Sequence, residues 1–170
     1  SWPKSAEVVE RAVAFTPDGL SVVSSCRDLR LWDIRDGRLL ATWNDTGSFN
    51  LPGRVAFNHD GTLCLSGGKP LTIWDTRTGH GTAMSGDDPG DRIAADQRPG
   101  VAFVADESIA VVLNVDCGPK APAAMTLWDV KSGVQIDLIV VDGEPRSLAV
   151  QGDLVFVGNG NSTVTVYRVR

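Results

Sequence analysis

Three aspartates at corresponding places along the chain are the first residues that could do chemistry. They are Asp33, Asp75 and Asp129, and each directly follows a tryptophan. A carboxylate can act as a general acid or base, but that role needs a partner group held close to it. Three equivalent carboxylates, each in its own segment, supply no such pair. We therefore expect each aspartate to accept hydrogen bonds from the amides of the turn that follows it.

The other groups with catalytic potential are few and widely spaced. His59 and His80 are the only histidines, and their spacing matches no metal-binding motif. Gly158 and Gly160 lack the third spaced glycine of a dinucleotide-binding fingerprint, and the chain contains neither a G-x-S-x-G elbow nor a P-loop. The sequence therefore predicts no enzyme, no cofactor and no metal site.

Composition argues against several further classes of protein. The three cysteines are too far apart for a disulfide framework or a metal knuckle, which favours reduced thiols. The net charge is −5 and the basic residues are scattered singly, so nucleic-acid binding is not expected. Apolar runs such as Ala110–Leu113 and Leu138–Val141 are far too short to cross a membrane. With no signal-peptide pattern at the N-terminus, these features predict a cytoplasmic protein.

The aspartates belong to a longer motif that recurs along the chain. Its copies are LWDIRDG at 31–37, IWDTRTG at 73–79 and LWDVKSG at 127–133. A second shared motif precedes each of them, as VAFTPDG at 13–19, VAFNHDG at 55–61 and VAFVADE at 101–107. Two linked motifs that recur in one order indicate a repeat architecture. A fourth copy is visible at Val164–Tyr167, with Tyr167 in place of tryptophan.

These paired motifs resemble WD40 repeats, the four-stranded blades of β-propellers. The dipeptide that names the family stands at Trp32–Asp33, Trp74–Asp75 and Trp128–Asp129. The separation of the Val-Ala-Phe copies fits the roughly 40–45 residues of a WD40 blade. The chain departs from the family in having no Gly–His pair ahead of any repeat. Residues other than aspartate stand in the turn before each aromatic strand, namely Cys26, Gly68, Pro122 and Asn161.

The resemblance, the many Val, Leu and Ile and the frequent turn residues together predict an all-β fold with four four-stranded antiparallel blades. The predicted domain covers residues 1–170, with blades at about 8–43, 54–85, 100–140 and 146–170. Strand a of each blade carries the Val-Ala-Phe motif and strand c ends on Trp–Asp. The predicted b strands are Ser21–Ser24, Leu63–Ser66, Ile109–Leu113 and Leu154–Val157. The predicted d strands are Leu39–Trp43, about Thr82–Ser85, and Val134–Val140.

The recurring aromatic residues have two interpretations. Trp32, Trp74, Trp128 and Tyr167 could form an aromatic ligand cage or could pack between neighbouring blades. Because the residue recurs at one blade position, we expect structural packing.

Four blades are few for a WD40 ring, so three arrangements of the chain stay open. Residues 1–6 pair with the Val164–Val169 strand and close the ring, the chain is part of a larger propeller, or two copies form an eight-blade homo-oligomer.

Long, unlike loops are predicted at one end of the blades only, at Asn44–Arg54, Gly86–Gly100 and Asn114–Ala124. Variable loops on a rigid scaffold commonly carry function. The candidate partner-binding residues on these loops are Phe49, Leu51, Asp87, Asp88, Asp91, Arg92, Arg98 and Lys120. The structural alternative for Phe49 and Leu51 is that they fold back onto the blades. The alternative for the three aspartates is a solvated turn, since their spacing fits no calcium loop.

The resemblance implies a non-catalytic scaffold or adaptor that binds a protein or peptide. The alternative is a regulatory propeller segment of a larger signalling protein that senses a glycan or a small molecule through the same loops. Neither interpretation involves nucleic acid, a membrane or a cofactor.

Overall fold

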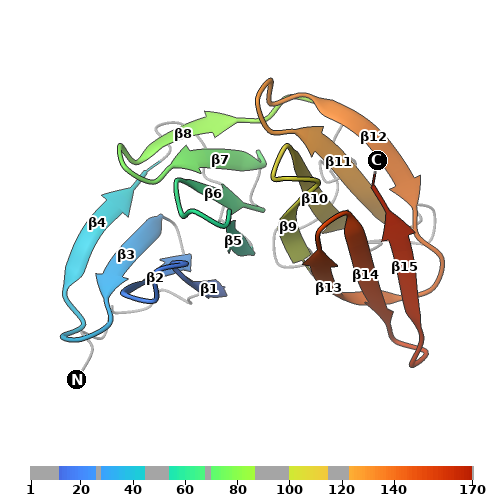
Figure 1. The fold of residues 1–170 in the computed structure, drawn as a ribbon, viewed down its shortest axis with the longest axis horizontal. Coiled ribbons are helices and arrows are strands. Elements are labelled where there is room, and N and C mark those ends of the chain that lie inside the picture. Colours follow the sequence, from blue (N-terminus) through green and yellow to red (C-terminus); the bar gives the residue numbers. More distant parts are fainter. Residues whose placement is uncertain are drawn as a thin grey trace.

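The computed structural model describes residues 12–25, 28–44, 54–67, 70–86, 100–114 and 123–169. All the regular elements in these ranges are β-strands, and they form four antiparallel sheets. Figure 1 shows the sheets arranged around a common centre as the blades of a propeller. The predicted all-β propeller fold is confirmed.

Each blade is a simple meander in which neighbouring strands in the sequence pair with one another. Blade 1 contains β1 (Ala12–Phe15), β2 (Ser21–Ser25), β3 (Leu29–Asp33) and β4 (Leu39–Trp43). Blade 2 contains β5 (Val55–Phe57), β6 (Leu63–Ser66), β7 (Thr72–Asp75) and β8 (His80–Ala83). Blade 3 contains β9 (Gly100–Val104), β10 (Ile109–Asn114), β11 (Ala124–Asp129) and β12 (Gln135–Val140). Blade 4 contains β13 (Pro145–Gln151), β14 (Leu154–Asn159) and β15 (Val164–Arg168).

Blade 4 shows three strands within the described residues, and the predicted d strands likewise belong to the first three blades. The copy of the repeat that forms blade 4 reaches its aromatic strand at β15, which ends at Arg168. One of the predicted arrangements pairs residues 1–6 with that strand. These residues lie outside the described part of the chain.

The tight turns between the first two strands of a blade explain the Asp-Gly pairs of the repeat. Gly19 and Gly61 have φ angles of 69° and 73°, a left-handed conformation that glycine adopts without steric cost. In the turn of Gly19, the Asp18 carboxylate accepts a hydrogen bond from the Leu20 amide. The third repeat has Glu107 in place of the glycine, and its turn has a different shape, because Ala105, Asp106 and Glu107 all have positive φ angles, of 51°, 54° and 65°.

Neighbouring blades pack face to face through apolar side chains that come from both sheets. Between blades 1 and 2, one core contains Val23, Leu29 and Trp43 of blade 1 with Cys64 and Trp74 of blade 2. Trp128 occupies the corresponding core between blades 2 and 3, and Tyr167 packs against the core between blades 3 and 4. Trp74, Trp128 and Tyr167 thus each face the preceding blade.

The four blades form an arc that is open on one side (Figure 1). The innermost strands β1, β5, β9 and β13 lie around the centre, and blades 1 and 4 extend from it in opposite directions. Adjacent innermost strands pack against each other, as β1 does with β5 and β9 does with β13. No comparable packing joins β1 to β13 in the described part of the chain.

Candidate functional site

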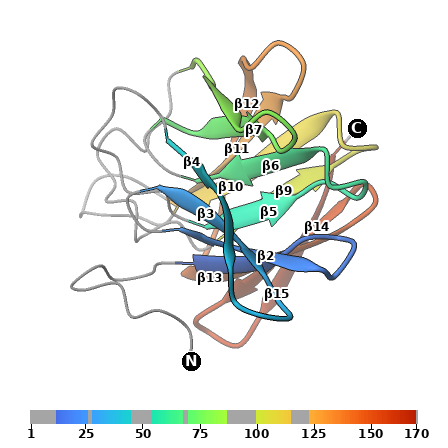
Figure 2. The ribbon, with the colours of Figure 1, turned by 90° about the vertical axis from the view of Figure 1, so that its left-hand side faces the viewer.

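The two ends of the blades differ, and each end is a candidate surface. The turn face carries the turns that join the first strand to the second and the third to the fourth. The connection face carries the links from the second strand to the third and from one blade to the next. An antiparallel meander places these two sets at opposite ends. In Figure 2 the β1–β2 turn of blade 1 lies on the right, and β4 ends on the left.

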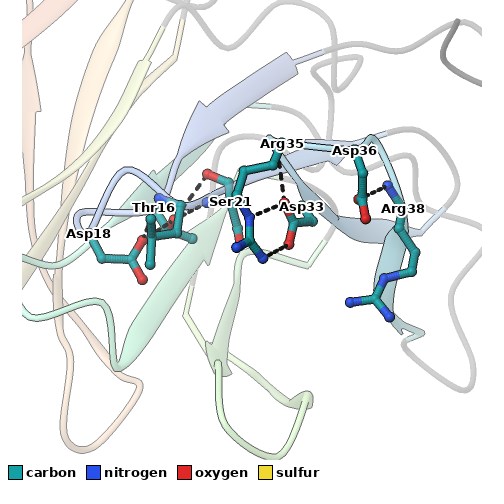
Figure 3. A network of polar contacts seen from close by, with 8 residues as sticks. Thr16, Asp18, Ser21, Asp33, Arg35, Asp36 and Arg38 are labelled. Carbon is teal, nitrogen blue, oxygen red and sulfur yellow. Dashed lines mark hydrogen bonds and ion pairs between the residues drawn. The ribbon is translucent and has the colours of Figure 1, made fainter.

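Asp33 is the centre of a polar network on the turn face of blade 1 (Figure 3). Its carboxylate accepts hydrogen bonds from the Arg35 amide at 2.8 Å and from the Arg35 guanidinium, whose Nη2 lies 2.8 Å from Oδ2. Nearby, the Asp36 carboxylate accepts a hydrogen bond from the Arg38 amide at 2.9 Å. The Thr16 hydroxyl donates to Asp18 at 2.6 Å. These polar groups are therefore used within their own hairpin turns.

The equivalent aspartates of blades 2 and 3 also bond within their own turns, but to the residue three positions further along the chain. Asp75 accepts hydrogen bonds from the amide and the hydroxyl of Thr78, at 2.7 and 3.0 Å. Asp129 accepts from the amide and the hydroxyl of Ser132, both at 2.6 Å. These bonds lower the pKa of both carboxyl groups, because they favour the charged form. All three aspartates close the turn after the aromatic strand.

The Arg35 side chain and amide also lower the pKa of Asp33, to about 2. An unfolded aspartate has a pKa of about 3.9, so protonation weakens the folded state. The contribution of Asp33 to stability is present above pH ~3.9 and is lost as the pH falls towards 2. We expect a carboxyl-detected NMR titration to give Asp33 a pKa near 2, and Asp33→Asn to have a shallower loss of stability in acid. An Asp33 pKa close to 3.9 would contradict this network.

Cys64 is the free cysteine among the described residues, and it is fully buried against Trp74 and Val23 in the core between blades 1 and 2. Burial raises the pKa of its thiol well above the usual range, which removes the reactive thiolate. We expect iodoacetamide to modify Cys64 in denaturant but not in the native protein, as measured by mass spectrometry of its peptide. Native labelling at the rate of a free thiol would show that this core opens. Cys26 and Cys117 lie outside the described residues.

Hydroxyl side chains inside the blades accept hydrogen bonds from the indole N–H groups, and these acceptors were not predicted from the sequence. Trp32 donates to Ser24 at 2.9 Å and Trp74 donates to Ser66 at 3.0 Å. Both serines stand eight residues before their tryptophan, a spacing that could have revealed them. In blade 3 Trp128 donates instead to Thr126 at 3.0 Å.

Register explains why a threonine takes over this role in blade 3. Ser66 pairs across the sheet with Thr72, and the equivalent pair in blade 3 is Val112 with Thr126. The acceptor hydroxyl is therefore on the second strand in blade 2 and on the paired residue of the third strand in blade 3. An acceptor within reach of the buried indole is retained in either case, which avoids an unsatisfied donor.

The predicted partner-binding residues all lie outside the described residues, in links whose ends are strands of the described structure. They are Phe49, Leu51, Asp87, Asp88, Asp91, Arg92, Arg98 and Lys120. The strand ends that flank their loops are described: Trp43 and Val55 border the first, Ala83 and Gly100 the second, and Asn114 and Ala124 the third. The described strand ends show where each loop begins and ends, and the placement of the predicted residues on a binding surface remains a prediction.

One described part of the connection face belongs to blade 4, and it is closed by its own hydrogen bonds. The Gly160 amide donates to the Glu144 carbonyl at 2.8 Å, and the Glu144 carboxylate pairs with Arg146 at 2.9 Å. Within the blade, the Asn159 side-chain amide donates to Thr165 at 3.1 Å. This part of the face offers exposed charges on Glu144 and Arg146.

The described residues contain no group of three or more His, Cys, Asp or Glu side chains placed to hold a metal ion. Within the same ranges, no helix is long and apolar enough to cross a membrane. A shallow hollow lies beside β12, lined by Gly86, Gln135, Ile136, Asp137 and Leu138. Its lining brings together no set of groups suited to catalysis.

Comparison with known proteins identifies the fold and no family. No protein-family model matches the sequence, and no curated protein matches it. Among solved structures, the chain is similar to the computationally designed Ika4 protein, with a TM-score of 0.71, 22% identity and coverage of 100% of this chain and 96% of that one. It is also similar to the computationally designed Ika8 protein, with a TM-score of 0.68 and 22% identity. That match covers 95% of this chain and 46% of the Ika8 chain.

Proposed function

We propose that this propeller is a non-catalytic protein-interaction module of WD40 type, a cytoplasmic scaffold or adaptor that binds a protein or peptide through its connection face. The observation that carries the proposal is the contrast between the two ends of the blades. Turn-face carboxylates such as Asp33 and Asp75 are used by their own turns. The connection face carries long links of unlike length, at 44–54, 84–99 and 115–123. Such loops on a rigid scaffold suit recognition.

The chemistry of the described residues supports binding in preference to catalysis. The three repeated aspartates have lowered pKa values and bonded oxygens, so they are poor general bases. The Cys64 thiol is buried and its pKa is raised, which makes it a poor nucleophile. These groups therefore serve the fold.

Within the proposed surface, different residues should contribute in different ways. Aromatic and arginine side chains carry a large share of binding energy at protein interfaces, which favours Phe49, Arg92 and Arg98 as anchors. The acidic segment with Asp87, Asp88 and Asp91 should act mainly on the association rate and its salt dependence. Lys120 would supply a charged contact at the edge.

A displayed peptide library selected on the immobilised chain tests this proposal. The affinity of the selected peptides is then measured for Phe49→Ala and Arg92→Ala, and for Asp36→Ala on the turn face as the control. We expect each connection-face variant to lose at least about tenfold in affinity, or about 1.4 kcal/mol, and the control to bind normally. Selected peptides that lose affinity only with the control variant would place binding on the turn face. A glycan or metabolite that binds in an array when no peptide does would favour the ligand-sensing alternative.

A further inference from the structure

The interfaces between the blades are built from the same repeat positions each time. Where the Trp-bearing side of a sheet meets the preceding blade, the phenylalanine of the first strand is covered. In blade 3 this residue is Phe103, which pairs across the sheet with Ala110 and is 8% exposed. In blade 1 the equivalent residue is Phe15, which pairs with Val22 and is 70% exposed. We call this side of blade 1 the leading face.

In the first three blades the opposite side of the sheet packs on the following blade, and the residues that make this contact also stand at repeated positions. The residue three positions before the aromatic one is buried in the first three blades, as Leu29, Leu71 and Met125, each at most 1% exposed. In blade 4 the equivalent residue is Val164, which is 64% exposed. Val166, two residues further along β15, is 52% exposed. We call this side of blade 4 the trailing face.

Blades 1 and 4 thus present two apolar sheet faces of the kinds that pack together at the three interfaces between blades. Exposed apolar patches of this kind mark protein interfaces. Charged residues on these sheets have partners, since Arg30 pairs with Asp28 at 3.3 Å in blade 1 and Arg168 with Asp153 at 3.4 Å in blade 4. Covering the faces would therefore bury no isolated charge.

We propose that each face is covered by a second copy of this chain. The leading face of each copy packs on the trailing face of the other, and the two arcs complete an eight-blade ring. This contact continues the packing already present at the internal interfaces. In Figure 1 blades 1 and 4 extend in opposite directions and the arc is open on one side, which is the shape that one identical arc completes. Each copy contributes one face of each kind, so two copies leave none uncovered.

This inference is independent of the proposed function, and the mass of the chain in solution tests it. A single chain has a mass of 18.1 kDa. Multi-angle light scattering should give about twice that value for the 170-residue chain. A monomer, or a series of larger open assemblies, would overturn the proposal. Phe15→Asp and Val166→Asp should each prevent dimer formation, because each places a charge on an apolar contact.

Mixing the two variants distinguishes this arrangement from other dimers. A mixed pair has one contact in which both faces are intact, whereas each variant alone has a substituted residue in both contacts. The mixture should therefore form a heterodimer that neither variant forms alone. Absence of heterodimer, with both variants folded by circular dichroism, would overturn the head-to-tail contact. Ile136→Asp on β12, which is exposed and lies on neither face, is the matched control and should remain dimeric.

Discussion

Replacing Trp74 with alanine is expected to reduce the free energy of unfolding by about 3–5 kcal/mol, the usual cost of truncating a buried aromatic residue. Trp74 is almost fully buried between blades 1 and 2 and stacks on Trp43, with ring centroids 6.3 Å apart and planes 22° from parallel. Its indole N–H donates to Ser66. The substitution therefore leaves a cavity and an unpaired hydroxyl, and chemical denaturation measures the loss.

Trp32 provides a matched control for Trp74, because it is the same residue at the same place in the repeat. It lies on the leading face of blade 1, which no preceding blade covers in the described part of the chain, and it is partly exposed. In a Phe15→Asp background, which keeps the leading face uncovered, Trp32→Ala should cost clearly less than Trp74→Ala. Equal losses at the two positions, or a loss below about 1 kcal/mol at Trp74, would contradict the packing between blades.

Gly79→Ala is expected to have the second largest effect, about 2–4 kcal/mol, because backbone strain and a steric clash add together. Gly79 has a φ of +70°, and a Cβ atom there would lie 2.5 Å from Cδ1 of Trp43. Gly19 has nearly the same φ, +69°, but a Cβ atom there would meet nothing within 4 Å. Gly19→Ala should therefore cost only the backbone term, about 1–2 kcal/mol.

Thermal and chemical denaturation of the two alanine variants separates these contributions. The difference between Gly79→Ala and Gly19→Ala reports the clash with Trp43 alone. If the two variants lose the same stability, Trp43 does not lie against the turn of blade 2, and the contact between these blades is wrongly placed.

The strands that are rich in apolar side chains and bounded by characteristic turn residues could be predicted from the sequence. The Trp–Asp pairs end β3, β7 and β11 as expected, and β4 covers the predicted Leu39–Trp43. The start of β8 could not be placed, and the strand begins at His80 where about Thr82 was predicted. Its sequence, HGTA, has no apolar alternation because most of this outer strand is exposed. The preceding turn, closed by the Gly79 amide on the Asp75 carbonyl at 2.8 Å, brings His80 directly into register.

The uncovered faces could not be predicted, because every repeat has apolar residues on both sides of its sheet. Val164 and Val166 have the same character as the buried Leu71 and Ile73, and only the arrangement of the blades leaves them exposed. The candidate site could be predicted only as a face. The indole acceptors were missed for a different reason: in blade 3 a valine, Val112, stands where blades 1 and 2 have serine, which hides the repeat spacing.

A double-mutant cycle between Trp43 and Trp74 tests most directly the claim that the aromatic strands of blades 2, 3 and 4 pack on the preceding blade. Trp43→Leu, Trp74→Leu and the double variant keep an apolar side chain at both positions while removing the stacked rings. Denaturation should show a coupling free energy of about 0.5–1.5 kcal/mol, as measured for other aromatic pairs. Strictly additive losses would mean that the two rings do not touch, and would contradict the arrangement of blades 1 and 2.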